Sequence, residues 1–212
     1  PRWSGPSVGW IVAADKKQEA QDLIIQLNQL SPQELFKRRT TTAPSSSKEK
    51  NEKSRNSSPH TKDKKGRLFI LGVGGSAGNA SHAVNDFRKI AGIESYTPVD
   101  NVSELTAWTN DMGFEFIFVN WLKTSHLNKK DTIMVFSVGG GTEKTSKNLL
   151  LAMRYAKKIG ASIVSIVSRN GGAALRFSDV CVLIPVISQE NITPHAEGWQ
   201  PVLWHLIVNA IQ

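Results

Sequence analysis

Four polar side chains stand in two pairs whose spacing suits shared chemistry. His82 and Asp86 are four residues apart in ASHAVNDFRKIAG, so a helix there puts both on one face. Glu197 and His205 are eight apart in TPHAEGWQPVLWHLIVNAI, which leaves them on roughly one side of a second helix. Facing pairs of histidine and carboxylate could hold a zinc ion, or they could work as acid and base.

A parallel sheet is predicted to position these helices. Short apolar runs bounded by turn residues predict buried strands at RLFILGV, DTIMVFSV, ASIVSIVS and DVCVLIPV, and SYTPV predicts a weaker one. Helical segments alternate with them: ASHAVNDFRKIAG ending at Gly92, SELTAWTND, a helix stopped by Gly160, and the C-terminal stretch. This order indicates the α/β class, a doubly wound parallel sheet flanked by helices.

Two glycine-rich loops follow predicted strands, GVGGSAGN at 72–79 and SVGGGT at 137–142. Open parallel sheets bind ligands beyond the carboxyl ends of their strands, where helix N-termini attract anions. The loops therefore favour anion binding, although glycines that merely permit tight turns remain an alternative. Neither loop ends in the GK[ST] of a Walker A motif. The first matches G-x-G-x-x-A, but its acidic candidates for a dinucleotide site, Glu94 and Asp100, stand beside the weak strand.

The region before the sheet differs in composition. Residues 1–39 predict a helical segment, and 40–65 predict a flexible basic linker that is nearly free of large apolar residues. Between Lys37 and Arg67 there are 11 basic and 3 acidic residues, whereas the rest of the chain has 15 of each, so the net charge of +8 belongs to this segment. A solvated linker explains the charge better than nucleic-acid binding, because aromatic residues are not interleaved with the basic ones. Residues 66–212 form the predicted third unit.

Other features restrict the class of protein. No stretch reaches the roughly 18–20 consecutive apolar residues of a membrane span. A single cysteine, Cys181, cannot form an internal disulfide, which suits a reducing cytoplasm, and its apolar surroundings predict a buried thiol. We therefore expect a cytoplasmic protein without membrane or nucleic-acid partners.

Residues 66–212 resemble the sugar isomerase (SIS) domain family, and within it the phosphoheptose isomerases. The resemblance rests on motifs that follow one another in the family's order: GVGGSAGNASHAVNDF, NVSELTAWTNDMGFEFIF, SVGGGTEK, RNGGAALRFSDVCVLIP and TPHAEGWQPVLWHLIV. It implies a flavodoxin-like three-layer fold, a sugar phosphate substrate, one zinc per site, and a homotetramer with sites shared between subunits. The implied reaction interconverts sedoheptulose 7-phosphate and an aldoheptose 7-phosphate through an enediol, for heptose in lipopolysaccharide or polysaccharide precursors.

The resemblance also implies roles for individual residues. Zinc would be held by His82, Asp86, Glu197 and His205, and Asp86 and His205 would act as the acid and base. Substrate contacts would come from three places, the first loop, an Asn-Asp pair and the second loop: Gly74, Gly75, Ser76, Asn110, Asp111, Ser137 and Thr142.

The chain departs from the family's pattern at four places. Asp86 replaces a longer Glu, Glu197 stands where Gln is usual, and the serine-rich phosphate loop is reduced to SVGGGT. Pro201 lies in the C-terminal stretch, so the helix is expected to kink there or to begin just before it, with Glu197 in a loop and His195 as a competing ligand. These departures leave a second hypothesis, a non-catalytic phosphosugar-binding or regulatory module; a nucleotide-dependent oxidoreductase ranks third.

Overall fold

The computed structural model describes residues 66–211. The predicted helical segment 1–39 and linker 40–65 therefore lie outside the described residues. The strands are short and all parallel, in the order β2-β1-β3-β4-β5. Their bounds are β1 Leu68–Gly72, β2 Ser95–Tyr96, β3 Thr132–Ser137, β4 Ser162–Val167 and β5 Val180–Leu183. This is the flavodoxin-like strand order, so the predicted fold class is confirmed.

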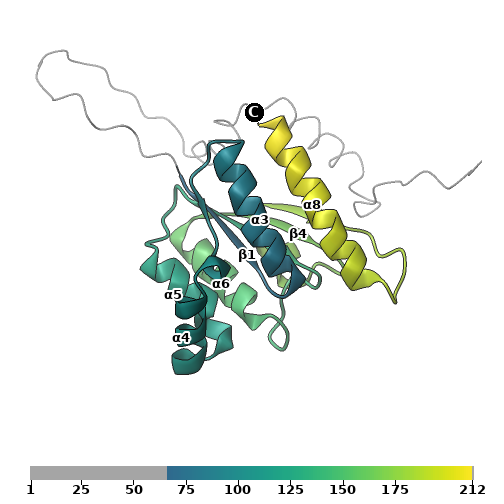
Figure 1. Ribbon diagram of the computed structural model, residues 1–212. Coiled ribbons are helices and arrows are strands. Elements are labelled where there is room, and N and C mark those ends of the chain that lie inside the picture. Colours follow the sequence, from purple (N-terminus) through teal and green to yellow (C-terminus); the bar gives the residue numbers. More distant parts are fainter. Residues whose placement is uncertain (1–65, 212) are drawn as a thin grey trace, which may run out of the picture.

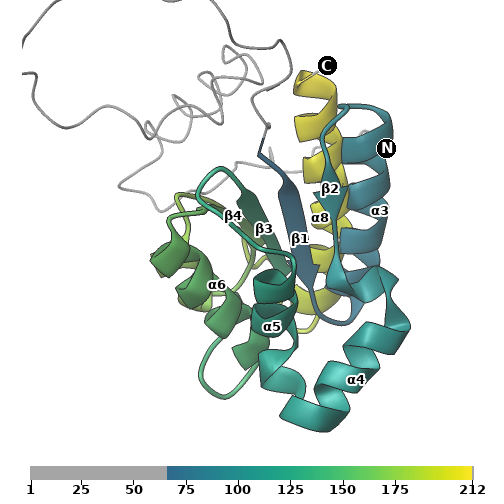
Figure 2. The same ribbon diagram turned by 90° about the vertical axis from the view of Figure 1, so that its left-hand side faces the viewer.

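Helices cover both faces of the sheet (Figures 1 and 2). The α-helices are α3 Gly75–Lys89, α4 Val102–Met112, α5 Ile117–Thr124, α6 Lys147–Ile159, α7 Gly172–Phe177 and α8 Ile192–Ala210. Two short 3₁₀ helices are η1 Pro98–Asp100 and η2 Phe114–Phe116. Helices α3 and α8 lie side by side on one face, and α5 and α6 lie on the other (Figure 2).

The buried residues form two clusters, one on each face of the sheet. Along β1 the side chains alternate between them: Phe69 and Leu71 pack with α5, α6 and α7, whereas Leu68 and Ile70 pack with α3 and α8. Both faces of the central strands are therefore buried, which explains why the sequences of these strands are continuous apolar runs.

Three local predictions need correction. The strand predicted at 95–99 is only two residues long, because Pro98 has no N–H for the ladder and begins η1 instead. Helix α3 begins at Gly75, so half of the first glycine loop forms the first helical turn. Helices α5 and α7 were not predicted, because they have only eight and six residues, and a helical period is hard to recognise over so short a length.

The helix α8 runs from Ile192 to Ala210 with Pro201 inside it. Glu197 and His195 are thus both helical. Of the two alternatives for Pro201, the helix that begins just before it, with Glu197 in a loop, is wrong. Among the helices of residues 66–211, none has both the length and the apolar character needed to cross a bilayer.

Candidate functional site

The helices α3 and α8 bring His82, Asp86 and His205 together. Within residues 66–211 these three form a group in which one ligand atom of each lies within 4.8 Å of the others. The oxygen Asp86 Oδ2 is 3.2 Å from His205 Nδ1 and 3.7 Å from His82 Nε2. The two imidazole rings meet edge to face, with their centroids 5.6 Å apart.

The three residues differ in exposure. The Asp86 side chain is 6% exposed, whereas those of His82 and His205 are 57% and 44% exposed. A buried carboxylate needs polar partners. Trp204 Nε1 donates to Oδ2 at 3.0 Å, and Asn85 Nδ2 donates to Oδ1 at 3.0 Å. The carboxylate is therefore the buried member of the group, and the two histidines are the members that face solvent.

These residues fit a zinc ion. Tetrahedral zinc with nitrogen and oxygen ligands at about 2.0–2.2 Å places neighbouring ligand atoms about 3.3–3.6 Å apart. The separations of 3.2 and 3.7 Å from Asp86 Oδ2 lie close to that range, and the three ligand atoms all lie within 4.8 Å of one another. Two imidazoles and one carboxylate are also a donor set that zinc commonly takes in catalytic sites. The shorter side chain of Asp86 thus does not prevent it from reaching both histidines.

Glu197 lies near the start of α3 rather than inside the group of three. A Cβ added to Gly75 would lie 2.3 Å from Glu197 Oε2, so this carboxylate packs directly on the first residue of α3. The end of the helix that attracts anions thus already faces a carboxylate. His195 does not join the group either, and its Nδ1 is buried without a hydrogen-bond partner.

The interface between α3 and α8 is tied by a second polar cluster. Asn79 Nδ2 donates to the backbone oxygen of Glu197 at 2.9 Å and to Gln200 Oε1 at 2.7 Å. Gln200 Nε2 donates to Ser76 Oγ at 3.0 Å, and both of these residues are fully buried. The predicted substrate residue Ser76 therefore points into the helix interface, while Gly74, with φ 64°, is the N-cap that turns the chain into α3.

The second glycine loop is packed against the start of α7. A Cβ on Gly140 would lie 2.0 Å from the backbone oxygen of Gly171, and one on Gly172 would lie 2.3 Å from that of Gly139. Ala173 and Ala174 donate their N–H groups to the oxygens of Gly141 and Gly140 at 2.8 and 2.9 Å. Close backbone approach thus accounts for these glycines.

The hydroxyls of the second loop also have partners within the loop. Ser137 Oγ accepts from the Gly140 N–H at 3.0 Å, which leaves its own proton for another acceptor. Thr142 Oγ1 accepts from the N–H groups of Lys144 and Thr145 and lies 3.4 Å from the Thr145 oxygen. Ser137 is therefore better placed than Thr142 to donate to a ligand.

The predicted pair Asn110 and Asp111 lies at the C-terminal end of α4. Both are exposed, and Asn110 Nδ2 donates to Asp111 Oδ1 at 2.8 Å. The structure does not bring them into the group of His82, Asp86 and His205. Sequence reasoning missed Trp204, Asn85 and Gln200, although Trp204 precedes His205 and Asn85 precedes Asp86.

Comparisons with known proteins agree with this fold. No family model matches the chain. A lincomycin biosynthesis protein of Streptomyces lincolnensis is 32% identical over 154 residues, covering 67% of this chain but only 54% of that protein, so the chain spans about half of it. A phosphoheptose isomerase of Helicobacter pylori is 28% identical over 157 residues, covering 72% of this chain and 77% of that enzyme.

Solved structures show the same architecture. The phosphoheptose isomerase from Neisseria gonorrhoeae matches with a TM-score of 0.60 and 22% identity, over 69% of this chain and 76% of the other. The phosphoheptose isomerase from Francisella tularensis gives 0.59 and 21%, over 69% and 75%. At these identities the structural likeness establishes the fold. The chain therefore has the fold of the phosphoheptose isomerases, and its sequence resembles these members of the sugar isomerase (SIS) domain family.

Proposed function

We propose that the protein is a phosphosugar isomerase that acts on a ketose phosphate, with sedoheptulose 7-phosphate as the first substrate to test. The observation that carries the proposal is the convergence of His82, Asp86 and His205 across α3 and α8. Relatives described as phosphoheptose isomerases support the substrate class.

Isomerisation moves a proton between adjacent carbons, which needs an accessible acid–base group. The resemblance assigns this work to Asp86 and His205, but only His205 is open to solvent. His205 directs Nδ1 towards Asp86, which leaves Nε2 as the ring nitrogen for a substrate proton. We therefore assign proton transfer to His205, with Asp86 orienting it from below.

His82, Asp86 and His205 would hold the metal, whereas the Glu197 carboxylate lies at Gly75, outside this group. A bound zinc ion would polarise the substrate's oxygen and stabilise negative charge there. The chain's own part is to fix three donors at short distances and to keep one side of the group open.

The glycine loops would hold the rest of the substrate. Seven residues separate Gly75 from His82 along α3, a rise of about 10 Å. This length is comparable with an extended sugar phosphate, so the phosphate end could lie at the loops while the carbonyl end lies at the histidines. Ser137, whose hydroxyl proton is free within its loop, is the side chain that we assign to the phosphate.

The resemblance further suggests a homotetramer and a place in making heptose for surface polysaccharide precursors. Both stay proposals, and sedimentation of the full chain would test the first.

The test is conversion of sedoheptulose 7-phosphate, followed by NMR of the sugar after chelation and again after zinc is restored. We expect zinc-dependent conversion that falls at least about 100-fold in His205→Ala. The matched control is His126→Asn, because His126 is exposed, far from the group in the fold, and has a φ of 52° that Asn tolerates.

The alternative is a phosphosugar-binding module without turnover. The internal hydrogen bonds of Thr142 favour it, because they reduce the donors available to a phosphate. Tight sugar phosphate binding without conversion at any zinc concentration would decide for this alternative.

A further inference from the structure

Trp204 is the largest fully buried side chain next to the three-residue group. Its indole stacks on Phe136 of β3, with centroids 5.7 Å apart and an interplanar angle of 18°. On its other sides it contacts the rings of His82 and His205, each at a centroid distance of 5.3 Å. The indole therefore joins the sheet to both histidines.

The indole N–H is directed at the functional carboxylate. Asp86 Oδ2 has three nitrogens around it: Trp204 Nε1 at 3.0 Å, His205 Nδ1 at 3.2 Å and His82 Nε2 at 3.7 Å. An indole N–H can only donate, and it does not titrate or bind a metal. The histidine nitrogens can exchange protons or bind a metal, whereas the Trp204 nitrogen can only donate its hydrogen bond to Asp86 Oδ2 and so hold that oxygen in place.

This restriction matters when a metal binds. Histidine nitrogens that coordinate a metal point lone pairs at it and have no proton to offer Asp86 on that side. The buried carboxylate still needs donors, and the indole N–H remains available. With Asn85 on Oδ1, the Trp204 N–H fixes the carboxylate plane in either state.

We propose that Trp204 is a positioning residue that sets Asp86 Oδ2 at the meeting point of His82 and His205 and thereby strengthens metal binding. Its rigid stacking on Phe136 fixes the donor, and so compensates for a carboxylate that is one methylene shorter than Glu. The inference rests on the proposed function only in taking these three residues as the metal-holding group.

Trp204→Phe tests the inference, because it keeps a stacked ring and removes the N–H. Cobalt(II) is the probe, with its dissociation constant measured by calorimetry and its geometry followed by visible absorption. Loss of an outer partner of a metal ligand typically weakens binding about 10- to 100-fold, and we expect a loss in that range with a changed cobalt spectrum.

Two further variants separate positioning from packing. Trp121→Phe is the matched control, since Trp121 is also buried in a core ring pair but lies on the opposite face of the sheet. It should lose stability without changing cobalt affinity. Replacing Trp204 by benzothienylalanine, which has the shape of Trp but no N–H, keeps the packed volume and should reproduce the loss seen with Phe.

A double-mutant cycle with Asp86→Ala completes the test. Without the carboxylate, Trp204→Phe should no longer weaken cobalt binding. An equal loss in both backgrounds, wild-type affinity and spectrum in the benzothienylalanine variant, or a wild type that binds no cobalt would each overturn the inference. Cobalt binding with the expected losses but no conversion of any sugar phosphate would instead end the proposed function and leave Trp204's role standing.

Discussion

Gly75 shows how closely one residue can be tied to another that lies 122 positions away in the chain. The carboxylate of Glu197 occupies the space that a side chain at Gly75 would need. Because Gly75 begins α3, the carboxylate also lies at the positive end of the helix dipole. Gly75 thus leaves the space that the Glu197 carboxylate occupies, whereas the preceding Gly74 turns the chain into α3.

Gly75→Ala should therefore reduce activity more than stability. The displaced group is the end of a flexible side chain, so the free energy of unfolding should change by no more than about 1 kcal/mol. Misplacement of a functional group by about 1 Å can cost about 100-fold in rate, and we expect a loss of 10- to 100-fold. Gly78→Ala is the control, because nothing lies within 4 Å of a Cβ there. Equal activity of the two variants would exclude a role for Glu197.

Cys181 is expected to be an unreactive thiol at neutral pH. The thiol is partly buried rather than fully buried as its apolar surroundings predicted, and desolvation raises its pKa to about 11, from 9.0. The folded state therefore keeps the thiol protonated, and the stability that this contributes is present below pH 9 and is lost as the pH rises towards 11. Alkylation by iodoacetamide at pH 7.5 should be much slower in the native protein than in urea. Comparable rates in both states would contradict this burial.

At the residue scale, the sequence predicted the three converging side chains but not what holds them. His82, Asp86 and His205 could be found because helical spacing and a family resemblance both indicate them. Trp204 and Asn85 look like ordinary core and surface residues in the sequence. Their function depends on a hydrogen bond to one carboxylate, which only the packing of α8 on α3 reveals.

The helix α8 lacks one backbone hydrogen bond at Pro201, and a side chain of α3 replaces it. Pro201 has no N–H for the carbonyl of Glu197, four residues before it. Asn79 of α3 donates to this carbonyl instead. The helix stays continuous, because the lost bond is replaced from outside it.

This replacement predicts that Asn79 and Pro201 are energetically coupled. Asn79→Ala should lower the free energy of unfolding by about 1–3 kcal/mol, since it leaves the Glu197 carbonyl and the buried Gln200 amide without a donor. In a Pro201→Ala background the helix supplies its own N–H, so the same change should cost less. Urea unfolding of the four proteins measures the coupling, and strictly additive losses would contradict it.

Elements differ in how well the sequence predicts them. The buried strands β1, β3, β4 and β5 and the helix α6 have strong, uninterrupted patterns, and their positions were predicted. By contrast, a sequence cannot show that Gly140 and Gly172 meet across two loops, so the packing role of these glycines was not predicted. The distinction between a ligand-binding glycine and a packing glycine lies in tertiary contact.

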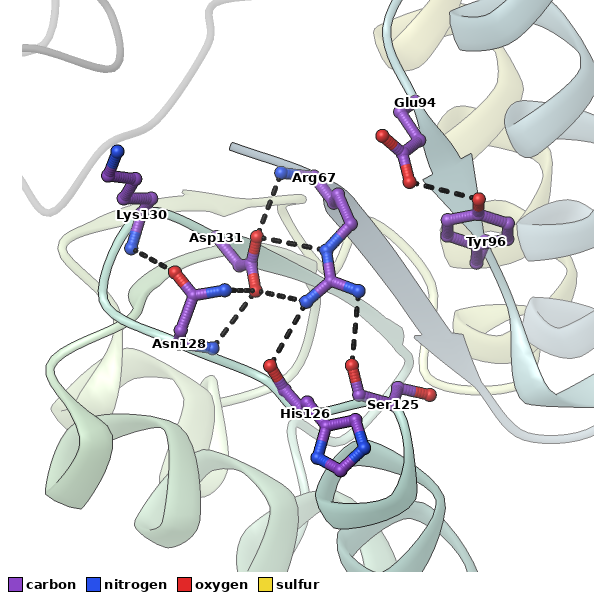
Figure 3. A network of polar contacts seen from close by, with 8 residues as sticks. All are labelled: Arg67, Glu94, Tyr96, Ser125, His126, Asn128, Lys130 and Asp131. Atoms are coloured by element: carbon purple, nitrogen blue, oxygen red, sulfur yellow. Dashed lines mark hydrogen bonds and ion pairs between the residues drawn. The ribbon is translucent and has the colours of Figure 1, made fainter. Parts of the chain in front are cut away.

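At the scale of the whole molecule, the candidate site and the main buried ion pair lie in separate regions. The candidate site lies between α3 and α8 on one face of the sheet, whereas a polar network lies where β1 and β3 begin (Figure 3). There Asp131, 2% exposed, pairs with Arg67 at 2.8 Å and raises the pKa of its guanidinium. It also accepts the backbone N–H groups of Arg67 and Asn128, each at 2.9 Å.

Asp131→Ala should therefore destabilise the fold and leave the site intact. It removes the partner of a half-buried cation and two backbone donors, which we expect to cost about 2–4 kcal/mol. The melting temperature should fall by about 5–10 °C. Lys157→Ala, which breaks the more exposed pair with Asp179, should cost less than about 1 kcal/mol. Thermal unfolding and cobalt titration of both variants check this. Weaker cobalt binding in Asp131→Ala would mean that the polar network around Asp131 is coupled to the group of His82, Asp86 and His205.

The pairing of α3 with α8 also fixes when the site can exist. His82 and Asp86 leave the ribosome early, soon after β1, but His205 follows the complete sheet in chain order. During synthesis the first two must wait for every intervening strand, so a nascent chain can fold its sheet before it can hold a metal. A metal would consequently stabilise only chains in which α8 has packed on α3, so its binding would distinguish completely folded chains from those that lack this last step.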